Sequence, residues 1–259
     1  MLTETQIARY HRDGYVVPDF RLPESMLEAI RSRHAALLER HPEFRDYCPM
    51  LFQYDLGFFQ YCDNPGILDM VEQLIGPDIA LWNSSLFAKP AHDGKRTPWH
   101  QDGEYWPIRP LATCSVWLAL DDSTAENGCL RVIKGSHTNR ALRAHRTVLG
   151  DDVTLHQELE PAELDESRAV DIVLKAGQLS LHDVYLLHGS EANTSPRSRR
   201  GMTMRFMPTT SVFDRDLARE MSKRPGIVDH SGRQVFLMRG VDRSGRNTFS
   251  RQARTATPA

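Results

Sequence analysis

The stretch IALWNSSLFAK (residues 79–89) marks the point where the chain changes from helix-like to strand-like sequence. Gly, Pro, Asp and Asn separate it from the β-prone runs that follow, as expected of strands joined by turns. These runs are TCSVWLALD (113–121), CLRVIKG (129–135), VDIVLKAGQLSLHD (170–183) and GMTMRFMP (201–208). The pattern predicts a sheet-dominated region that begins near residue 79.

The sequence before residue 79 is typical of helices. Thr3 and Gln6 form a capping-box pattern, which predicts a short helix that ends at Gly14. Pro23 suits the first position of a second helix, along which apolar residues recur at helical spacing. A third helix is expected over residues 67–74. Helices followed by many strands predict a mainly β, α+β fold with the N-terminal helices packed on one face of the sheet.

We expect a single domain over residues 1–259, a length that suits one large core. Inside the sheet region, the acidic and irregular residues 142–165 are expected to form a lid-like surface insertion. The final TATPA (255–259) is expected to be disordered. The expected parts are a helical segment (1–78), the sheet core (79–210) and a C-terminal extension (211–259).

The composition excludes several classes of protein. A net charge of -2 predicts no bulk attraction to nucleic acid or to an anionic membrane. No apolar run approaches the roughly 18 residues of a membrane span. The four cysteines form no C-x-x-C pair, which favours reduced thiols in a cytoplasmic protein. The oligomeric state leaves no mark on the sequence.

The segment TPWHQDGEYW (97–106) carries a candidate metal site. On a strand, residues two apart point the same way, so His100 and Asp102 present an imidazole and a carboxylate to one point. Two histidines and one carboxylate form the facial triad of non-haem Fe(II), which leaves one face of the metal open. The pair therefore predicts two of three iron ligands, and a hydrogen-bonded structural histidine is the alternative.

The H-x-D/E pattern recurs elsewhere in the chain. His11-Arg12-Asp13 lies on a predicted helix, where residues two apart point about 200° away from each other and cannot chelate. Residues 41–43 span a proline-broken helix end, and residues 156–158 lie in the acidic insertion. We interpret these three copies as solvated surface groups. For the third ligand, His182 ends a predicted strand and His188 precedes a tight corner at Gly189-Ser190, and the residues alone do not separate them.

Three segments together resemble the phytanoyl-CoA dioxygenase family. They are KPAHDGKRTPWHQDGEYWPIRP (89–110), SVWLALDDSTAENGCLRVIKGSH (115–137) and LLHGSEANTSPRSRRGMTMRFMP (186–208). The resemblance runs over about residues 7–208, with the motifs in the family's order. It implies a double-stranded β-helix (jelly-roll, cupin-like) core and an Fe(II)- and 2-oxoglutarate-dependent oxygenase that consumes O2.

The resemblance also implies roles for individual residues. The iron ligands fall on His100, Asp102 and His188, and the arginine for the distal carboxylate of 2-oxoglutarate falls on Arg199. A guanidinium suits a carboxylate because it donates two parallel hydrogen bonds. Arg197 and Arg200 are nearby alternatives, although Arg200 should face the other side of its strand and Arg197 a loop. The further positions implied for the co-substrate pocket are Ser190, Trp117 and Ser85.

Family chemistry implies that 2-oxoglutarate is decarboxylated to succinate and CO2 while a substrate C–H bond is hydroxylated. An aspartate at position 102 favours hydroxylation, because related halogenases carry a small residue there and bind halide. The rival hypotheses are a metal-binding scaffold without turnover and a zinc-dependent isomerase or hydrolase of cupin type.

The substrate leaves few marks on the sequence. Glu104, Tyr105 and Trp106 follow the predicted metal strand, and Arg205 shares a strand face with Arg199. We interpret all four as candidate substrate contacts, against core packing for the two aromatic residues and a surface ion pair for Arg205. The acidic insertion argues against a polyanion-binding surface, so a small free metabolite is favoured over a CoA thioester.

Overall fold

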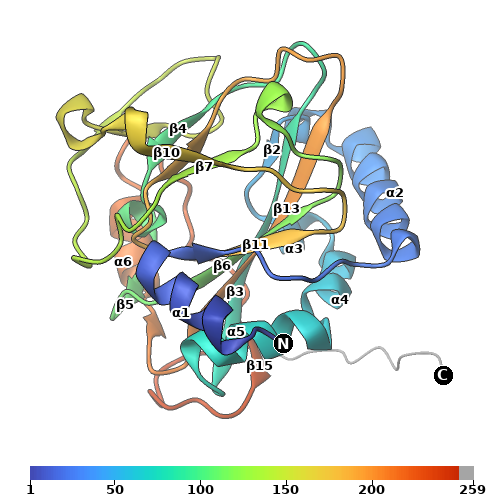
Figure 1. Cartoon of the computed structure of the whole chain (residues 1–259). Helices are drawn as coiled ribbons and strands as arrows, with labels where there is room; N and C mark the ends of the chain where they lie inside the picture. Colours follow the sequence, from blue (N-terminus) through green and yellow to red (C-terminus); the bar gives the residue numbers. More distant parts are fainter. Residues whose placement is uncertain (251–259) are drawn as a thin grey trace.

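The computed structural model describes residues 1–250, so the expected disorder of residues 255–259 concerns residues outside the described part. Two antiparallel sheets lie against each other, and helices cover the outer face of the larger one (Figure 1). This arrangement confirms the mainly β, α+β architecture with helices on one face. None of the described helices combines the length and the apolar composition that crossing a bilayer requires.

The larger sheet is built around two long neighbouring strands. Its members are β1 (Tyr15–Val16), β2 (Tyr47–Cys48), β3 (Ile79–Lys89), β6 (Cys114–Ala119), β11 (Leu179–Asp183), β13 (Arg199–Pro208) and β15 (Phe236–Arg239). The order is β1–β11–β6–β13–β3–β15, and β2 also pairs with β3. Strands β3 and β13 pair from Lys89–Arg199 to Ile79–Pro208, with a register shift after Arg205.

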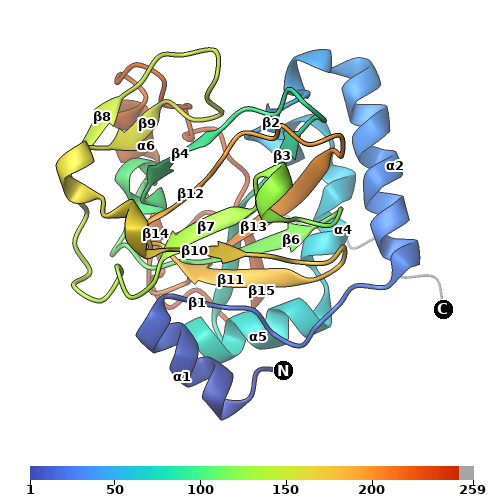
Figure 2. The ribbon, with the colours of Figure 1, turned by 45° about the horizontal axis from the view of Figure 1, so that its top comes forward.

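The smaller sheet has the order β10–β7–β12–β4. Its strands are β4 (Thr97–His100), β7 (Leu130–Ile133), β10 (Ala169–Ile172) and β12 (His188–Ser190). Two further pairs stand outside both sheets: β5 (Ile108–Arg109) with β14 (Val212–Phe213), and β8 (His145–Thr147) with β9 (Gln157–Leu159). In Figure 2 the smaller sheet lies across the larger one, and the space between them holds the candidate site.

The three predicted helices are present as α1, α2 and α5, whereas α3, α4 and α6 were not predicted. They are α1 (Glu4–Asp13), α2 (Glu24–Arg40), α3 (Leu51–Tyr54), α4 (Phe59–Cys62), α5 (Pro65–Ile75) and α6 (Arg215–Met221). The capping box of Thr3 and Gln6 is present, and Gly14 ends α1 in the left-handed conformation. Pro23 precedes α2 instead of starting it, because its ψ of 146° is extended.

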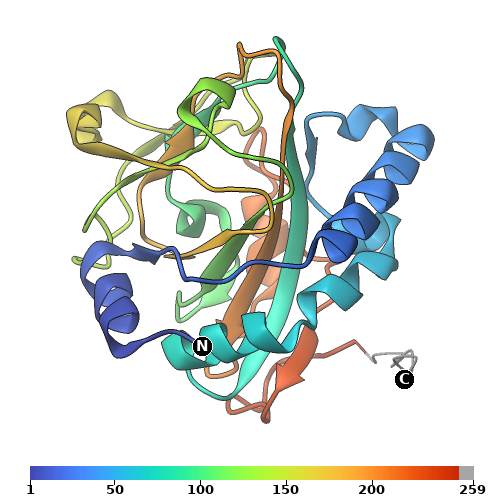
Figure 3. The ribbon, with the colours of Figure 1, turned by 45° about the vertical axis from the view of Figure 1, so that its right-hand side comes forward.

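The main hydrophobic core lies between the helices and the larger sheet. Apolar residues of α1, α2, α3 and α5 pack against alternate residues of β3, β6, β11 and β13. Figure 3 shows α2 and α4 beside the two long strands, on the side away from the smaller sheet. Because one face of the larger sheet is fully used by this core, its other face is left for the site.

Residues 142–165 contain the hairpin of β8 and β9, which lies beside β4. Arg96 Nη1 donates to Glu158 at 2.7 Å, and the Arg143 amide donates to Gln101 Oε1 at 2.7 Å. The insertion is therefore fastened to the strand that carries His100. The division of the single domain into residues 1–78, 79–210 and 211–259 stays a prediction. Strands from all three of these parts join the larger sheet.

Candidate active site

His100 and His188 lie directly opposite each other on β4 and β12 of the smaller sheet. Their ring centroids are 4.2 Å apart, and both residues are buried. The Nδ1 atom of His100 is 2.7 Å from the carbonyl oxygen of Pro98, and that of His188 is 2.9 Å from Leu186 O. Since a carbonyl only accepts, each Nδ1 carries the proton and each Nε2 offers a free lone pair, as metal-binding histidines require.

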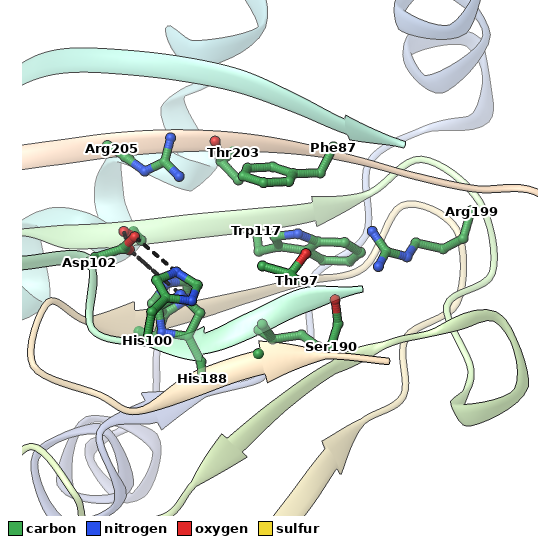
Figure 4. Close-up of a pocket in the computed structure, with 14 residues that line it drawn as sticks. Phe87, Thr97, His100, Asp102, Trp117, His188, Ser190, Arg199, Thr203 and Arg205 are labelled. Atoms are coloured by element: carbon green, nitrogen blue, oxygen red, sulfur yellow. Dashed lines mark hydrogen bonds and ion pairs between the residues drawn. The ribbon is translucent and has the colours of Figure 1, made fainter. Parts of the chain in front are cut away.

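Asp102 completes the cluster, although it lies beyond the end of its strand. Strand β4 ends at His100, Gln101 is still extended, and Asp102 starts a short 3-10 turn over Asp102–Tyr105. Its Oδ1 is 3.7 Å from His100 Nε2, and its Oδ2 is 3.9 Å from His188 Nε2. The ligand atoms of all three residues lie within 4.8 Å of one another (Figure 4).

The charge state of this cluster suits a divalent cation. Burial raises the pKa of Asp102, but the facing His188, His100 and His182 together hold that pKa well below its usual value. Burial and the neighbouring His100 hold the pKa of His188 well below its usual value. An ionised carboxylate and a neutral imidazole are the protonation states in which these groups bind metal.

His182 also reaches the cluster, from β11 of the larger sheet. Its Nε2 is 3.6 Å from Asp102 Oδ2, and its ring centroid is 4.9 Å from that of His188. Both histidines that the sequence left open are thus close to Asp102, but the set of converging ligand atoms contains His188 and not His182. The difference comes from strand pairing, because only His188 lies opposite His100.

A buried arginine lies at the far end of the same pocket. Arg199 is 2% exposed and forms no ion pair with any residue between 1 and 250, and its guanidinium lies over the Trp117 ring at 5.3 Å. One of its nitrogens donates to the carbonyl of Gly128, while Nε has no hydrogen-bond partner. Burial lowers the pKa of Arg199 to about 10, so the group stays charged at neutral pH. A buried cation of this kind requires an anionic partner.

The two alternative arginines are engaged elsewhere. Arg200 points to the opposite side of β13, where its Nε and Nη2 each donate to Asp121 at 2.8 Å. Arg197 is exposed and pairs with Glu126 at 3.0 Å. Of the three arginines that the sequence left open, Arg199 is therefore the one that faces the pocket.

The pocket extends from the triad to Arg199 and is lined by both sheets (Figure 4). Gly201 makes room for the Trp117 indole, since a Cβ at this position would lie 2.3 Å from the ring. Ser85 is placed differently from the expectation, because it lies behind Arg205 and accepts a hydrogen bond from it at 2.9 Å. The lining residues are Phe87, Thr97, His100, Asp102, Ser115, Trp117, Leu130, His182, His188, Gly189, Ser190, Arg199, Thr203 and Arg205.

A second cavity of about 160 Å³ adjoins this pocket and shares Arg205 with it. Tyr105 and Trp106 line the cavity. Trp106 is also part of a hydrophobic cluster, so this side chain both packs in the core and forms part of the cavity wall. Glu104 lines neither space and pairs with Arg224 at 2.7 Å. Residues 154–157, 226–228 and 230 also line this cavity, and no chemical motif in the sequence indicates them.

Two of the other three H-x-D/E copies are not the solvated surface groups that we expected, because their carboxylates, on Asp13 and Glu158, are largely buried and ion-paired. Asp13 is only 6% exposed and pairs with Arg12 at 2.7 Å, so this carboxylate is not solvated. It is buried because α1 packs on the loop that contains Lys134, whose amine is 3.3 Å from Asp13. His156 is half-buried and faces the second cavity. His41 pairs with Glu43 near the surface.

Solved structures of known enzymes share this fold. The non-haem monooxygenase ThoJ in its apo form is 25% identical, with a TM-score of 0.74 over 95% of this chain and 88% of that chain. The epimerase SnoN, solved with Fe3+, α-ketoglutarate and nogalamycin RO, is 22% identical, with a TM-score of 0.67 over 87% and 91%. Fold and site together define a non-haem iron, 2-oxoglutarate-dependent oxygenase.

Residues 10–201 match the family model described as phytanoyl-CoA dioxygenase (PhyH). The human protein named "Phytanoyl-CoA dioxygenase, peroxisomal" is 33% identical over 234 residues, which cover 80% of this chain and 68% of the human one. The chain belongs to the phytanoyl-CoA dioxygenase family. Fe(II), 2-oxoglutarate and O2 are accordingly its cofactor and co-substrates.

Proposed function

We propose that the protein hydroxylates a C–H bond of a small metabolite while 2-oxoglutarate is decarboxylated. In the balanced reaction, R–H, 2-oxoglutarate and O2 give R–OH, succinate and CO2. The observation that carries the proposal is the pocket with His100, Asp102 and His188 at one end and the unpaired Arg199 at the other. A ligand that binds a metal at one end and carries a carboxylate at the other fits both.

His100, Asp102 and His188 would hold the iron, through two imidazole nitrogens and one carboxylate oxygen. When bound, Fe(II) supplies the site where O2 and the keto acid react, a chemistry that side chains do not provide. Arg199 would bind the distal carboxylate of 2-oxoglutarate through its free Nε edge. Trp117 would fix the plane of this guanidinium, and Ser190, which lines the same pocket, would donate a hydrogen bond to the co-substrate.

The insertion would act as a lid over the substrate. Thr154, Leu155, His156 and Gln157 of this segment line the cavity next to the metal cluster, opposite Tyr105. Excluding bulk water from that cavity would limit unproductive reaction at the metal. A cytoplasmic location stays a prediction, and the human relative is named as peroxisomal.

The experiment is a turnover assay with the purified protein, Fe(II), ascorbate and 2-oxoglutarate against a panel of metabolites. We expect 2-oxoglutarate-dependent O2 uptake with an equal amount of succinate, which a true substrate accelerates. Asp102→Ala should abolish both signals and keep the fold, measured by circular dichroism. The matched control is Asp121→Ala, because Asp121 binds Arg200 on the opposite face of the sheet.

Two results would reject the proposal. Absence of succinate across the panel would remove the oxygenase activity, and full activity in Asp102→Ala would mean that the triad is misassigned. Turnover that ignores 2-oxoglutarate and is lost on zinc removal would favour the isomerase or hydrolase hypothesis.

A further inference from the structure

Three arginines of the described chain are less than a tenth exposed, namely Arg199, Arg205 and Arg233. None of the ion pairs found among residues 1–250 includes any of them. Each has one guanidinium nitrogen that is buried and has no hydrogen-bond partner. Burying a cation without a counter-charge costs several kcal/mol, on the order of a whole protein's stability. The proposed co-substrate accounts for Arg199 and leaves the other two unexplained.

Arg205 is held rigidly, with one edge of its guanidinium left open. Its Nη1 donates to Ser85 Oγ at 2.9 Å, and the planar group lies 5.0 Å from the Trp106 ring. The Nε atom on the opposite edge has no hydrogen-bond partner within the described part of the chain. On the same strand, Arg200 uses its Nε and Nη2 to hold both oxygens of Asp121. The open edge of Arg205 is therefore a preformed binding site for two oxygens in a plane.

Among the described residues, the carboxylate that lines the metal pocket together with Arg205 is that of the metal ligand Asp102, whose pKa Arg205 helps to lower. On the side of the second cavity, the further charge near Arg205 is positive. Arg233 lies behind the cavity wall, where it donates to Asn83 and to the Pro49 carbonyl. Burial and the charge of Arg205 lower the pKa of Arg233 to about 9, so it stays largely cationic at neutral pH. Burial and Arg233 hold the pKa of His230 well below its usual value, so this ring is neutral. The residues that line the cavity within the described chain include no Asp or Glu.

The 2-oxoglutarate molecule cannot satisfy Arg199 and Arg205 together. The two residues are six positions apart on one strand, which separates their backbones by about 20 Å. Figure 4 shows them at opposite ends of the pocket, with the metal cluster nearer to Arg205. A five-carbon keto acid that is bound to the metal and held by Arg199 leaves Arg205 facing the second cavity.

We propose that the substrate to be hydroxylated carries a carboxylate, which Arg205 binds through its open edge in the cavity lined by residues 154–157, 226–228 and 230. This inference rests on the proposed function, and it assigns the substrate class and the specificity-determining residue. Ser85 and Trp106 are positioning residues, since they fix the plane of the guanidinium. The rest of the substrate packs between Tyr105, Ile227 and Val228.

The test measures binding to metal-free protein, so it does not depend on turnover. Isothermal titration calorimetry compares a panel of small carboxylic acids (hexanoate, phenylacetate, N-acetylated amino acids) with the primary amide of each. We expect at least one acid to bind at least 30-fold more tightly than its amide. Arg205→Gln should remove that preference, Arg205→Lys should restore only part of it, and Arg200→Gln should leave it unchanged.

A second measurement separates the two arginines. The KM for 2-oxoglutarate, from substrate-independent succinate formation, should change less than twofold in Arg205→Gln and rise strongly in Arg199→Gln. The inference is overturned if no acid is preferred over its amide, if the preference survives in Arg205→Gln, or if Arg205→Gln raises the 2-oxoglutarate KM as Arg199→Gln does. Tighter binding of alkyl phosphates than of the matching acids would also overturn it. Lack of succinate from wild-type protein, by contrast, rejects the proposed function alone.

Discussion

The two faces of β13 are both buried but differ in polarity. On the outer face, Met202, Met204 and Phe206 are fully buried in the core beneath the helices. On the inner face, Arg199, Thr203 and Arg205 are equally inaccessible, yet they are polar and line the pocket. Because side chains alternate along a strand, one segment supplies stability on one side and chemistry on the other.

The arginines on the two faces of β13 also differ in whether a carboxylate neutralises their charge. Arg200 points outward and has both oxygens of Asp121 as partners, whereas Arg199 and Arg205 point inward and have no ion pair among the described residues. A paired arginine is explained by the fold itself. An unpaired one is a cost in the free energy of folding that a ligand can offset, so it marks a binding site.

The largest expected effect is on the KM for 2-oxoglutarate, when an arginine of the inner face is replaced and compared with the same replacement on the outer face. Arg199→Gln removes two charge-assisted hydrogen bonds to 2-oxoglutarate, about 4 kcal/mol in total, so the KM should rise roughly 1000-fold. Arg200→Gln removes a partner of Asp121 and should leave that KM unchanged. Steady-state succinate formation measures both, and equal effects of the two substitutions would contradict the division between faces.

The next effect concerns stability. Met204 is fully buried among the helices, so Met204→Ala should lower the free energy of unfolding by about 3 kcal/mol through lost burial and a cavity. The KM for 2-oxoglutarate should stay the same, because the outer face does not touch the pocket. Urea unfolding monitored by circular dichroism gives the first value. The control is Val173→Ala, whose side chain is 56% exposed and whose loss should cost less than about 0.5 kcal/mol. A shift in KM would show that the two faces are coupled.

The smallest effect is a pH dependence on the helical side. Burial, together with Arg200, lowers the pKa of His34 on α2 to about 4. In the unfolded chain this pKa is about 6.5, so between these values the unfolded state binds more protons and stability falls as the pH falls. At pH 5 the loss is about 2 kcal/mol.

The substitution His34→Leu should remove this loss. Urea midpoints at pH 7 and pH 5 should therefore differ less in the variant than in the wild type. The difference in stability between wild type and variant should be smaller at pH 7 than at pH 5, because at pH 7 His34 is mostly neutral in both the folded and the unfolded state. An identical pH dependence would show that the inner-face histidines, and not His34, dominate acid destabilisation.

Much of the fold and part of the site follow from local patterns in the sequence. The capping box of α1, the long β3 and β13 strands, and the alternation that sends Arg199 and Arg200 to opposite faces all depend on neighbours in sequence. His100 and Asp102 also converge as expected, although an extended Gln101 and not a continuous strand brings them together.

Other features of the site had no such signal. Residues 226–228 and 230 line the second cavity, although nothing in their sequence indicates a ligand. Ser85 was expected to line the co-substrate pocket, and it instead accepts a hydrogen bond from Arg205. Glu104 follows the metal strand but turns to Arg224. Each of these placements depends on which distant segment packs alongside, and a single sequence does not encode that information in a local pattern.

The sequence by itself determined the chemistry that is available: an H-x-D pair, two later histidines and three closely spaced arginines. Tertiary structure decided how that chemistry is used. The pairing of β12 with β4 places His188 opposite His100, while His182 approaches Asp102 from the other sheet. It also decided which arginines lack a counter-charge. Whether a charge is compensated depends on groups that are close in space, and distance in space is what folding sets.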